Sequence, residues 1–224
     1  MIAFVFIVFA LANSISSGQE VQKYTLPLAP NTVISITENL KTGDGSLIFD
    51  LVVNHGVNPN GYINQNGDMT LTRLTALFGN SETLEKLCQL GAKPTGKDLY
   101  LASVRGDTNV MAVLEKYGAD VKYLSNFDGR SAFTRAILSG KLEAAKWLAS
   151  HGSPIQTELK IAPTDADKTP FLELAVKSAH CTPEIVDYLA SIGFRPTANL
   201  ADKIPANHPL KETLRAAILK NSTN

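Results

Sequence analysis

The pattern of apolar and polar positions between residues 97 and 121 predicts two short helices separated by a glycine. Leu99 and Ala102 lie three positions apart, so they share one face of a first helix. After Arg105 and Gly106, apolar residues occupy the i, i+3, i+4 and i+7 positions of a second helix: Val110, Val113, Leu114 and Tyr117. We therefore expect a helix pair in which each helix buries one apolar stripe.

A similar ending closes five such segments along the chain. The residues around the glycine read "VNHGVNP", "CQLGAKP", "KYGADV", "ASHGSPI" and "ASIGFRP". The five glycines are separated by 35, 27, 34 and 41 residues: Gly56, Gly91, Gly118, Gly152 and Gly193. A recurring spacing of about 33 residues is typical of stacked repeats. We expect five units that pack on one another, because a lone helix pair cannot bury its stripes.

Each of these glycines is expected to end a second helix in the left-handed backbone conformation. That conformation has a positive φ angle, which glycine adopts readily because it has no Cβ atom. The chain can then turn toward the next unit. The stretch after Gly118, "DVKYLSNFDGR", carries the Asn, Asp and Gly residues of a tight turn and is expected to project as a hairpin.

These residues resemble the ankyrin-repeat family, whose units begin with an Asp-Gly turn followed by a Thr-Pro-Leu-His tetrad. "DGRSAFTRAILSGKLEAAKWLASHG" matches that pattern at Asp128, Gly129, Phe133, Ala136, Gly140 and Gly152. "KTPFLELAVKSAHCTPEIVDYLASIG" matches it at Thr169, Pro170, Phe171, Leu174 and Ala175. The resemblance implies an all-α fold: an ankyrin-repeat solenoid of stacked helix pairs with short β-hairpin-like turns.

The array is expected to span residues 31–224, with atypical units at both ends. Residues 31–56 resemble a first capping unit, and "HPLKETLRAAILKN" is expected to form a closing helix. No unit has the complete tetrad, so we expect lower stability than in a regular array. The last unit carries extra residues in "PIQTELKIAPTDAD". Extra length of this kind normally forms a loop on one face, where partners often bind.

The first residues of the chain favour an export signal. An uncharged apolar run extends from Ile2 to Ala12 and is followed by small and polar residues. The run is shorter than the roughly 20 residues that span a bilayer, but it fits the apolar region of a secretory signal. The alternative is a buried N-terminal helix or strand. We expect residues 1–18 to be a signal peptide and residues 19–30 an extended lead-in. The mature chain, without a membrane span, would be periplasmic or secreted.

The charged and nucleophilic residues do not form a recognisable catalytic or metal-binding pattern. The 21 Lys and Arg residues equal the 21 Asp and Glu residues. A nucleic-acid partner, which requires a concentrated positive surface, is therefore not expected. His180 is adjacent to Cys181, and Asp165 is close to Asp167, but no further residue completes a metal site or a catalytic group. We expect no enzyme activity, cofactor or metal; an enzyme with an unrecognised site is the alternative.

The two cysteines belong to different units, Cys88 to the second and Cys181 to the fifth. Helix layers stacked about 10 Å apart would hold them far beyond the roughly 7 Å between Cα atoms that a disulfide allows. We predict that both remain thiols and that Cys88 is buried as a small apolar residue. His55 and His151 each precede a unit-ending glycine, where a helix C-terminus favours donors to its carbonyl groups.

The ankyrin resemblance implies a protein-binding module whose contact residues lie at the turn tips and near the end of each first helix. Carried over position by position, these residues are Gln65, Asn66, Asp68, Leu77, Phe78, Val104, Arg105, Phe127, Asp128, Arg130, Leu138, Ser139, Lys168 and Lys177. Phe127 is the clearest candidate, because a turn tip has no core to bury it and exposed aromatic residues often dominate binding energy. The alternative is that Phe127 folds back onto its own hairpin.

The expected partner is a protein, and the chain is expected to be a monomer when unbound. One hypothesis is an immunity-type role, in which the chain blocks a toxic effector in the periplasm. The alternative is a periplasmic accessory protein that supports a partner enzyme rather than inhibiting it. The residues alone do not separate these two roles, because both use the same kind of binding surface.

Overall fold

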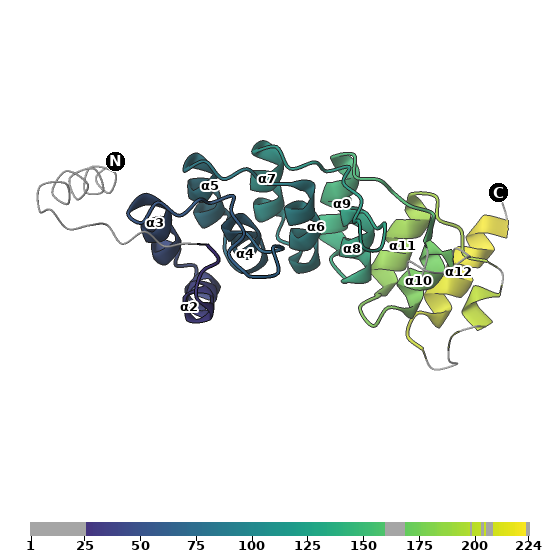
Figure 1. The fold of residues 1–224 in the computed structure, drawn as a ribbon. Coiled ribbons are helices and arrows are strands. Elements are labelled where there is room, and N and C mark those ends of the chain that lie inside the picture. The colour runs from purple at the N-terminus through teal and green to yellow at the C-terminus, as the bar shows by residue number, and fades with distance from the viewer. Residues whose placement is uncertain (1–25, 160–168, 198, 203, 205–207, 223–224) are drawn as a thin grey trace, which may run out of the picture. The chain divides into compact units, whose positions relative to one another are not determined.

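The computed structural model describes residues 26–159, 169–197, 199–202, 204 and 208–222, and these are mainly α-helical (Figure 1). The expectation of a helical chain is confirmed. The helices are α2 (Pro30–Lys41), α3 (Ser46–Val53), α4 (Leu71–Phe78), α5 (Ser81–Gln89), α6 (Gly96–Arg105), α7 (Thr108–Lys116), α8 (Ala132–Leu138), α9 (Leu142–Ser150), α10 (Phe171–Lys177), α11 (Pro183–Ser191), the 3-10 helix η1 (Leu200–Asp202) and α12 (Lys211–Ser222). The proposed signal peptide, Asp165, Asp167 and Lys168 lie outside the described residues.

Consecutive helices form the pairs that the sequence predicts, and the first helix of three pairs starts at a Ser or Thr N-cap. The hydroxyl groups of Thr70 and Ser131 accept hydrogen bonds from the backbone N–H three residues later, at 3.1 and 3.2 Å. At the start of α6, the carboxylate of Asp98 accepts from the N–H and the hydroxyl of Thr95, both at 2.7 Å. These side chains satisfy backbone groups that a helix start leaves without partners.

The unit-ending glycines adopt the predicted left-handed conformation. Their φ angles are all positive: 65° at Gly56, 98° at Gly91, 98° at Gly118, 83° at Gly152 and 100° at Gly193. At the end of α7, Gly118 N–H donates to Glu115 O at 2.9 Å, and Ala119 N–H donates to Leu114 O at 2.9 Å. The second bond links residues five positions apart and marks a Schellman ending.

Contacts divide the chain into two compact units, Met1–Lys93 and Pro94–Asn224. In the first unit, α2 packs on α3 and α4, and α4 packs on α5. In the second unit, α6 packs on α7 and α8, α8 packs on α9 and α10, and α7 packs on α9. Within each unit, a helix pair therefore packs against its neighbour in the sequence, as the repeat pattern predicts.

The buried face of the α6–α7 pair corresponds closely to the predicted stripes. Leu99, Val110 and Leu114 are fully buried, and Ala102 is nearly so. Tyr117, by contrast, is half-buried at the C-cap of α7. The pattern also missed a core residue, because Met111 is fully buried although it lies beside the stripe. Neighbouring helices cover α7 on more than one side, so its buried surface is wider than a single stripe.

Among the residues that the structure describes, strand pairing occurs in the connections between α3 and α4, between α7 and α8, and between α9 and α10. Isolated antiparallel bridges join Tyr62 to Thr70 and Leu124 to Ser131. In the third connection, β1 (Glu158–Leu159) pairs with β2 (Thr169–Pro170). Strand pairing within the described ranges is confined to these connections, in agreement with the predicted β-hairpin-like turns.

Candidate functional site

The hairpin after Gly118, residues 123–131, is a tight turn and is called the tip hairpin below. Ser125 N–H donates to Arg130 O at 2.9 Å, and Gly129 N–H donates to Ser125 O at 2.7 Å. Gly129 has a φ of 67°, a left-handed conformation that the turn requires and that glycine adopts without strain. The chain is thus reversed within a few residues, with Phe127 near the outermost point.

Asp128 fixes the tip hairpin to α6. Its carboxylate accepts the hydroxyl hydrogen of Tyr100, with Oη lying 3.1 Å from Oδ2 and 3.3 Å from Oδ1. The carboxylate also accepts the N–H of Arg130 at 3.2 Å and lies 3.6 Å from the Arg130 Nε atom. Burial, and then the neighbouring Asp128 charge, raise the pKa of Tyr100, because both favour the protonated hydroxyl that donates to Asp128.

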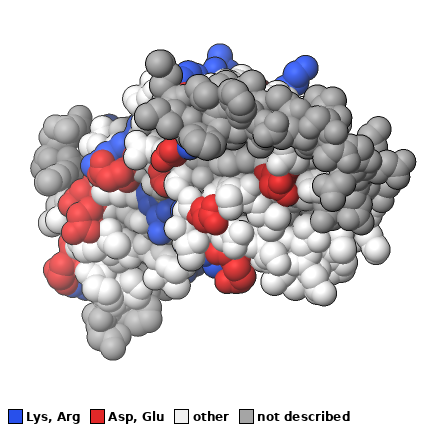
Figure 2. Space-filling model, turned by 90° about the vertical axis from the view of Figure 1, so that its left-hand side faces the viewer, with Lys and Arg blue, Asp and Glu red and all other residues white. Residues whose placement is uncertain are grey.

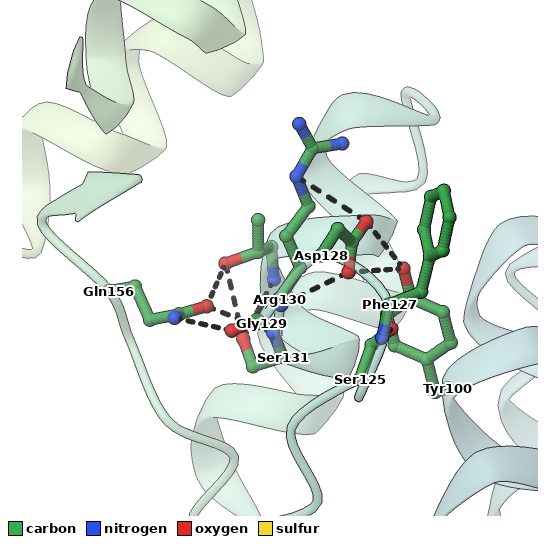
Figure 3. A network of polar contacts seen from close by, with 9 residues as sticks. Tyr100, Ser125, Phe127, Asp128, Gly129, Arg130, Ser131 and Gln156 are labelled. Carbon is green, nitrogen blue, oxygen red and sulfur yellow. Dashed lines mark hydrogen bonds and ion pairs between the residues drawn. The ribbon is translucent and has the colours of Figure 1, made fainter. Parts of the chain in front are cut away.

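Gln156 holds the other side of the tip hairpin. Its side-chain Nε2 donates to Gly129 O at 2.8 Å, and its Oε1 accepts the Ser131 N–H at 2.9 Å. The same oxygen accepts from the Thr134 hydroxyl at 3.2 Å. Figure 3 shows Gln156 reaching the tip hairpin from a separate segment of the chain. The tip hairpin is therefore held in place by Tyr100 from the helix pair before it and by Gln156, which follows the helix pair after it.

Phe127 does not fold back onto its own hairpin, the alternative considered from the sequence. Its side chain is 81% exposed, more than any other large apolar residue among those described. In Figure 3 its ring points away from the polar contacts around Asp128. An exposed ring on a hairpin that is fixed by the hydrogen bonds of Asp128 and Gln156 is an unusual combination, because hairpin tips are often mobile and polar. The sequence prediction of an exposed aromatic residue at this tip is confirmed.

A recess of about 380 Å³ lies between the tip hairpin, the first half of α6 and α8. Its walls include the aromatic rings of Tyr100, Tyr123 and Phe127 and the cationic side chains of Lys97 and Arg135. The rings of Tyr100 and Tyr123 meet edge to face, with centroids 6.3 Å apart. The Arg135 guanidinium lies over the Tyr100 ring, 5.9 Å from its centroid. Sequence reasoning named only Phe127 and Asp128 among the residues that line this recess.

The start of α6 requires a glycine because the tip hairpin approaches it closely. A Cβ atom at Gly96 would lie 2.3 Å from the Tyr123 Cβ and 2.7 Å from the backbone oxygen of Asp120. We expect Gly96→Ala to lower the free energy of unfolding by about 1 to 3 kcal/mol, because neither contact can be relieved by a side-chain rotation. Urea denaturation measures the change, with Lys97→Ala as the neighbouring control. If Gly96→Ala and Lys97→Ala had the same free energy of unfolding, Tyr123 would not lie as close to residue 96 as the structure places it.

The predicted contact residues of the Met1–Lys93 unit occupy a second hairpin tip and the end of α4. Gln65, Asn66 and Asp68 are exposed between Tyr62 and Thr70. The Asp68 side chain accepts from the Asn64 amide, and its backbone oxygen accepts from Arg73. At the last turn of α4, Leu77 is half-buried and Phe78 is 38% exposed.

In the Pro94–Asn224 unit, the other predicted contact residues lie where each first helix ends. Val104 is half-buried and Arg105 is exposed at the end of α6, while Leu138 and Ser139 are half-buried at the end of α8. Lys177 is exposed at the end of α10 and pairs with Glu173 at 2.9 Å. Asp128 and Arg130 are only 11% and 17% exposed in their side chains, and both serve mainly to position the tip hairpin.

The remaining titratable candidates take structural positions. His151 lies on the end of α9, where its Nδ1 is 2.7 Å from Trp147 O and its ring stacks on the Trp147 indole. Cys88 and Cys181 are not joined in a disulfide, and Cys88 is buried, as predicted. Burial raises the pKa of the Cys181 thiol to about 11, which leaves little thiolate at neutral pH. Among the residues that the structure describes, no His, Cys, Asp and Glu side chains gather as a metal site.

No protein-family model matches the sequence, and a search of curated proteins finds no match. None of the helices in the described ranges is both long and apolar enough to cross a bilayer. On the face drawn in Figure 2, acidic and basic side chains occur among many uncharged ones. The part of this face that the structure describes carries no broad basic patch of the kind that nucleic acids bind.

Proposed function

We propose that this chain is a protein-binding module of the ankyrin-repeat type, and that the tip hairpin contacts its protein partner. The observation that carries this proposal is Phe127, an aromatic side chain that is 81% exposed on a turn held by Tyr100, Asp128 and Gln156. A folded chain gains nothing in its own stability from such a ring. Burial of the ring by a partner would remove a large apolar area from water.

The fixed geometry of the tip hairpin favours tight binding. A partner that binds a mobile loop must first order it, and this lowers the net binding free energy. The hydrogen bonds of Asp128 and Gln156 have already ordered this turn in the unbound chain. Aromatic residues, Phe included, are enriched at protein interfaces, where a few buried residues supply most of the binding energy.

The finer proposal is that the chain is exported and inhibits a toxic enzyme, as immunity proteins do. It is supported by the signal-like residues 1–18 and by the type of binding surface, which suits a protein rather than a small molecule. Inhibition requires the partner to be an enzyme whose activity falls when the chain is added. An accessory role would instead leave that activity unchanged or raise it, so one activity assay distinguishes the two.

The experiment is to isolate the partner by co-purification with the full chain and to measure its affinity for variants. We expect Phe127→Ala to weaken binding by at least about 2 kcal/mol, roughly thirtyfold. Leu219→Ala is the matched control, because Leu219 is an apolar residue of α12 that is 68% exposed. An affinity unchanged within about 0.5 kcal/mol, with the helical signal intact, would place the interface elsewhere.

A further inference from the structure

The recess beside the tip hairpin combines aromatic walls with two cationic side chains. Lys97 comes from the first turn of α6, and Arg135 comes from the middle of α8. Tyr100, Tyr123 and Phe127 provide the apolar surface between them. All of these residues belong to the Pro94–Asn224 unit, so the recess is complete within one compact part of the chain.

The charges inside the recess are unbalanced. Asp128, its one acidic residue, already accepts hydrogen bonds from the Tyr100 hydroxyl and the Arg130 N–H and is paired with the Arg130 side chain. Among the residues that the structure describes, neither Lys97 nor Arg135 has an ion-pair partner. The Nε atom of Arg135 is buried and has no hydrogen-bond acceptor. A buried polar group without a partner lowers stability, and native proteins rarely retain one without a reason.

We infer that the recess binds an acidic side chain of the protein partner, carried on a segment whose adjacent apolar residue packs against Phe127. This inference rests on the proposed function and specifies the chemistry of the partner. A carboxylate accepts charge-assisted hydrogen bonds from the planar Arg135 guanidinium and pairs with the Lys97 ammonium. The aromatic walls and the bound segment together would reduce the contact of this carboxylate with water, which would make the attraction stronger than at an open surface. The opposite charges also select the partner over neutral segments of the same shape.

The probe is a random peptide library displayed on phage and selected against the full chain. We expect the selected peptides to carry Asp or Glu within two residues of a large apolar residue. A synthetic peptide of the consensus sequence is then measured by fluorescence anisotropy. Lys97→Gln together with Arg135→Gln should raise its Kd about tenfold, the loss expected when charge-assisted contacts are removed. Lys122→Gln is the control, because Lys122 is exposed next to Tyr123 but does not line the recess.

A charge exchange gives a second test that does not depend on Arg135. Lys97→Glu should bind a peptide with Lys in place of its acidic residue better than the wild-type chain does. Phe127→Ala could weaken binding of the consensus peptide while the Lys97→Gln, Arg135→Gln double variant binds it as tightly as the wild-type chain does. The acidic-residue inference would then be wrong, and the proposed binding surface would stand. If neither Phe127→Ala nor the Lys97→Gln, Arg135→Gln double variant changes the Kd of the peptide, the proposed surface is wrong as well. Failure of the library to yield any binding peptide also contradicts the inference.

Discussion

Leu114→Ala is expected to lower the free energy of unfolding by about 2 to 5 kcal/mol, a large share of the stability of a domain of this size. Leu114 is fully buried on α7, and α7 packs against α6 and α9. Removal of its side chain would leave a cavity that several helices line at once. Those helices cannot all close on it, so the cavity would persist and add to the loss of apolar burial.

Urea denaturation followed by circular dichroism measures this effect. Asn109→Ala on the same helix is the control, because Asn109 is exposed and its replacement should change stability by no more than about 0.5 kcal/mol. A denaturation midpoint that Leu114→Ala hardly moves would mean that Leu114 does not lie in a core between helices. The register of the apolar stripe would then be wrong.

Phe133→Ala is expected to cost about 3 to 5 kcal/mol of stability, while Phe127→Ala should cost less than about 0.5 kcal/mol. The two phenylalanines are close in sequence, but Phe133 is fully buried and Phe127 is 81% exposed. The Phe133 ring packs against Phe171, with centroids 6.3 Å apart, and Phe171 packs against Phe194 at 5.5 Å. Loss of the Phe133 ring therefore removes one end of a row of aromatic contacts that runs through Phe171 to Phe194.

The same two variants separate a folding role from a binding role. Thermal or urea denaturation of both proteins, side by side, gives the stability difference directly. A large destabilisation by Phe127→Ala would show that its ring is buried in solution, and the tip hairpin would lose its main reason to be a binding surface. A small effect of Phe133→Ala would contradict the packing described for α8 and α10.

Local and periodic features of this fold could be predicted from the sequence. The helix pairs follow from apolar spacing, since Leu99, Val110 and Leu114 repeat at helical intervals and are all buried. The left-handed glycines follow from the recurring endings, because glycine adopts a positive φ with no steric penalty. Phe127 could be singled out because a ring at a turn tip has no core beside it. Each of these arguments uses only neighbouring residues.

The contacts that hold the candidate site could not be predicted in this way. Tyr100 and Asp128 are 28 residues apart, and Gln156 reaches Gly129 across 27 residues. These hydrogen bonds depend on how one helix pair packs against the next. The spacing of apolar residues along the sequence does not determine that packing. Lys97 and Arg135 were missed for the same reason, since an isolated cation on a helix usually lies in solvent. Only the folded arrangement places both beside the tip hairpin.

Hydrogen–deuterium exchange of the full chain, with and without its purified protein partner, tests the proposed binding surface most directly. We predict that the partner slows exchange in peptides that cover the tip hairpin, residues 123–131, and in the first turn of α6 around Lys97. The closing helix α12 should exchange at the same rate in both samples. Slower exchange confined to other segments, for example residues 154–159, with the tip hairpin unchanged, would contradict the account.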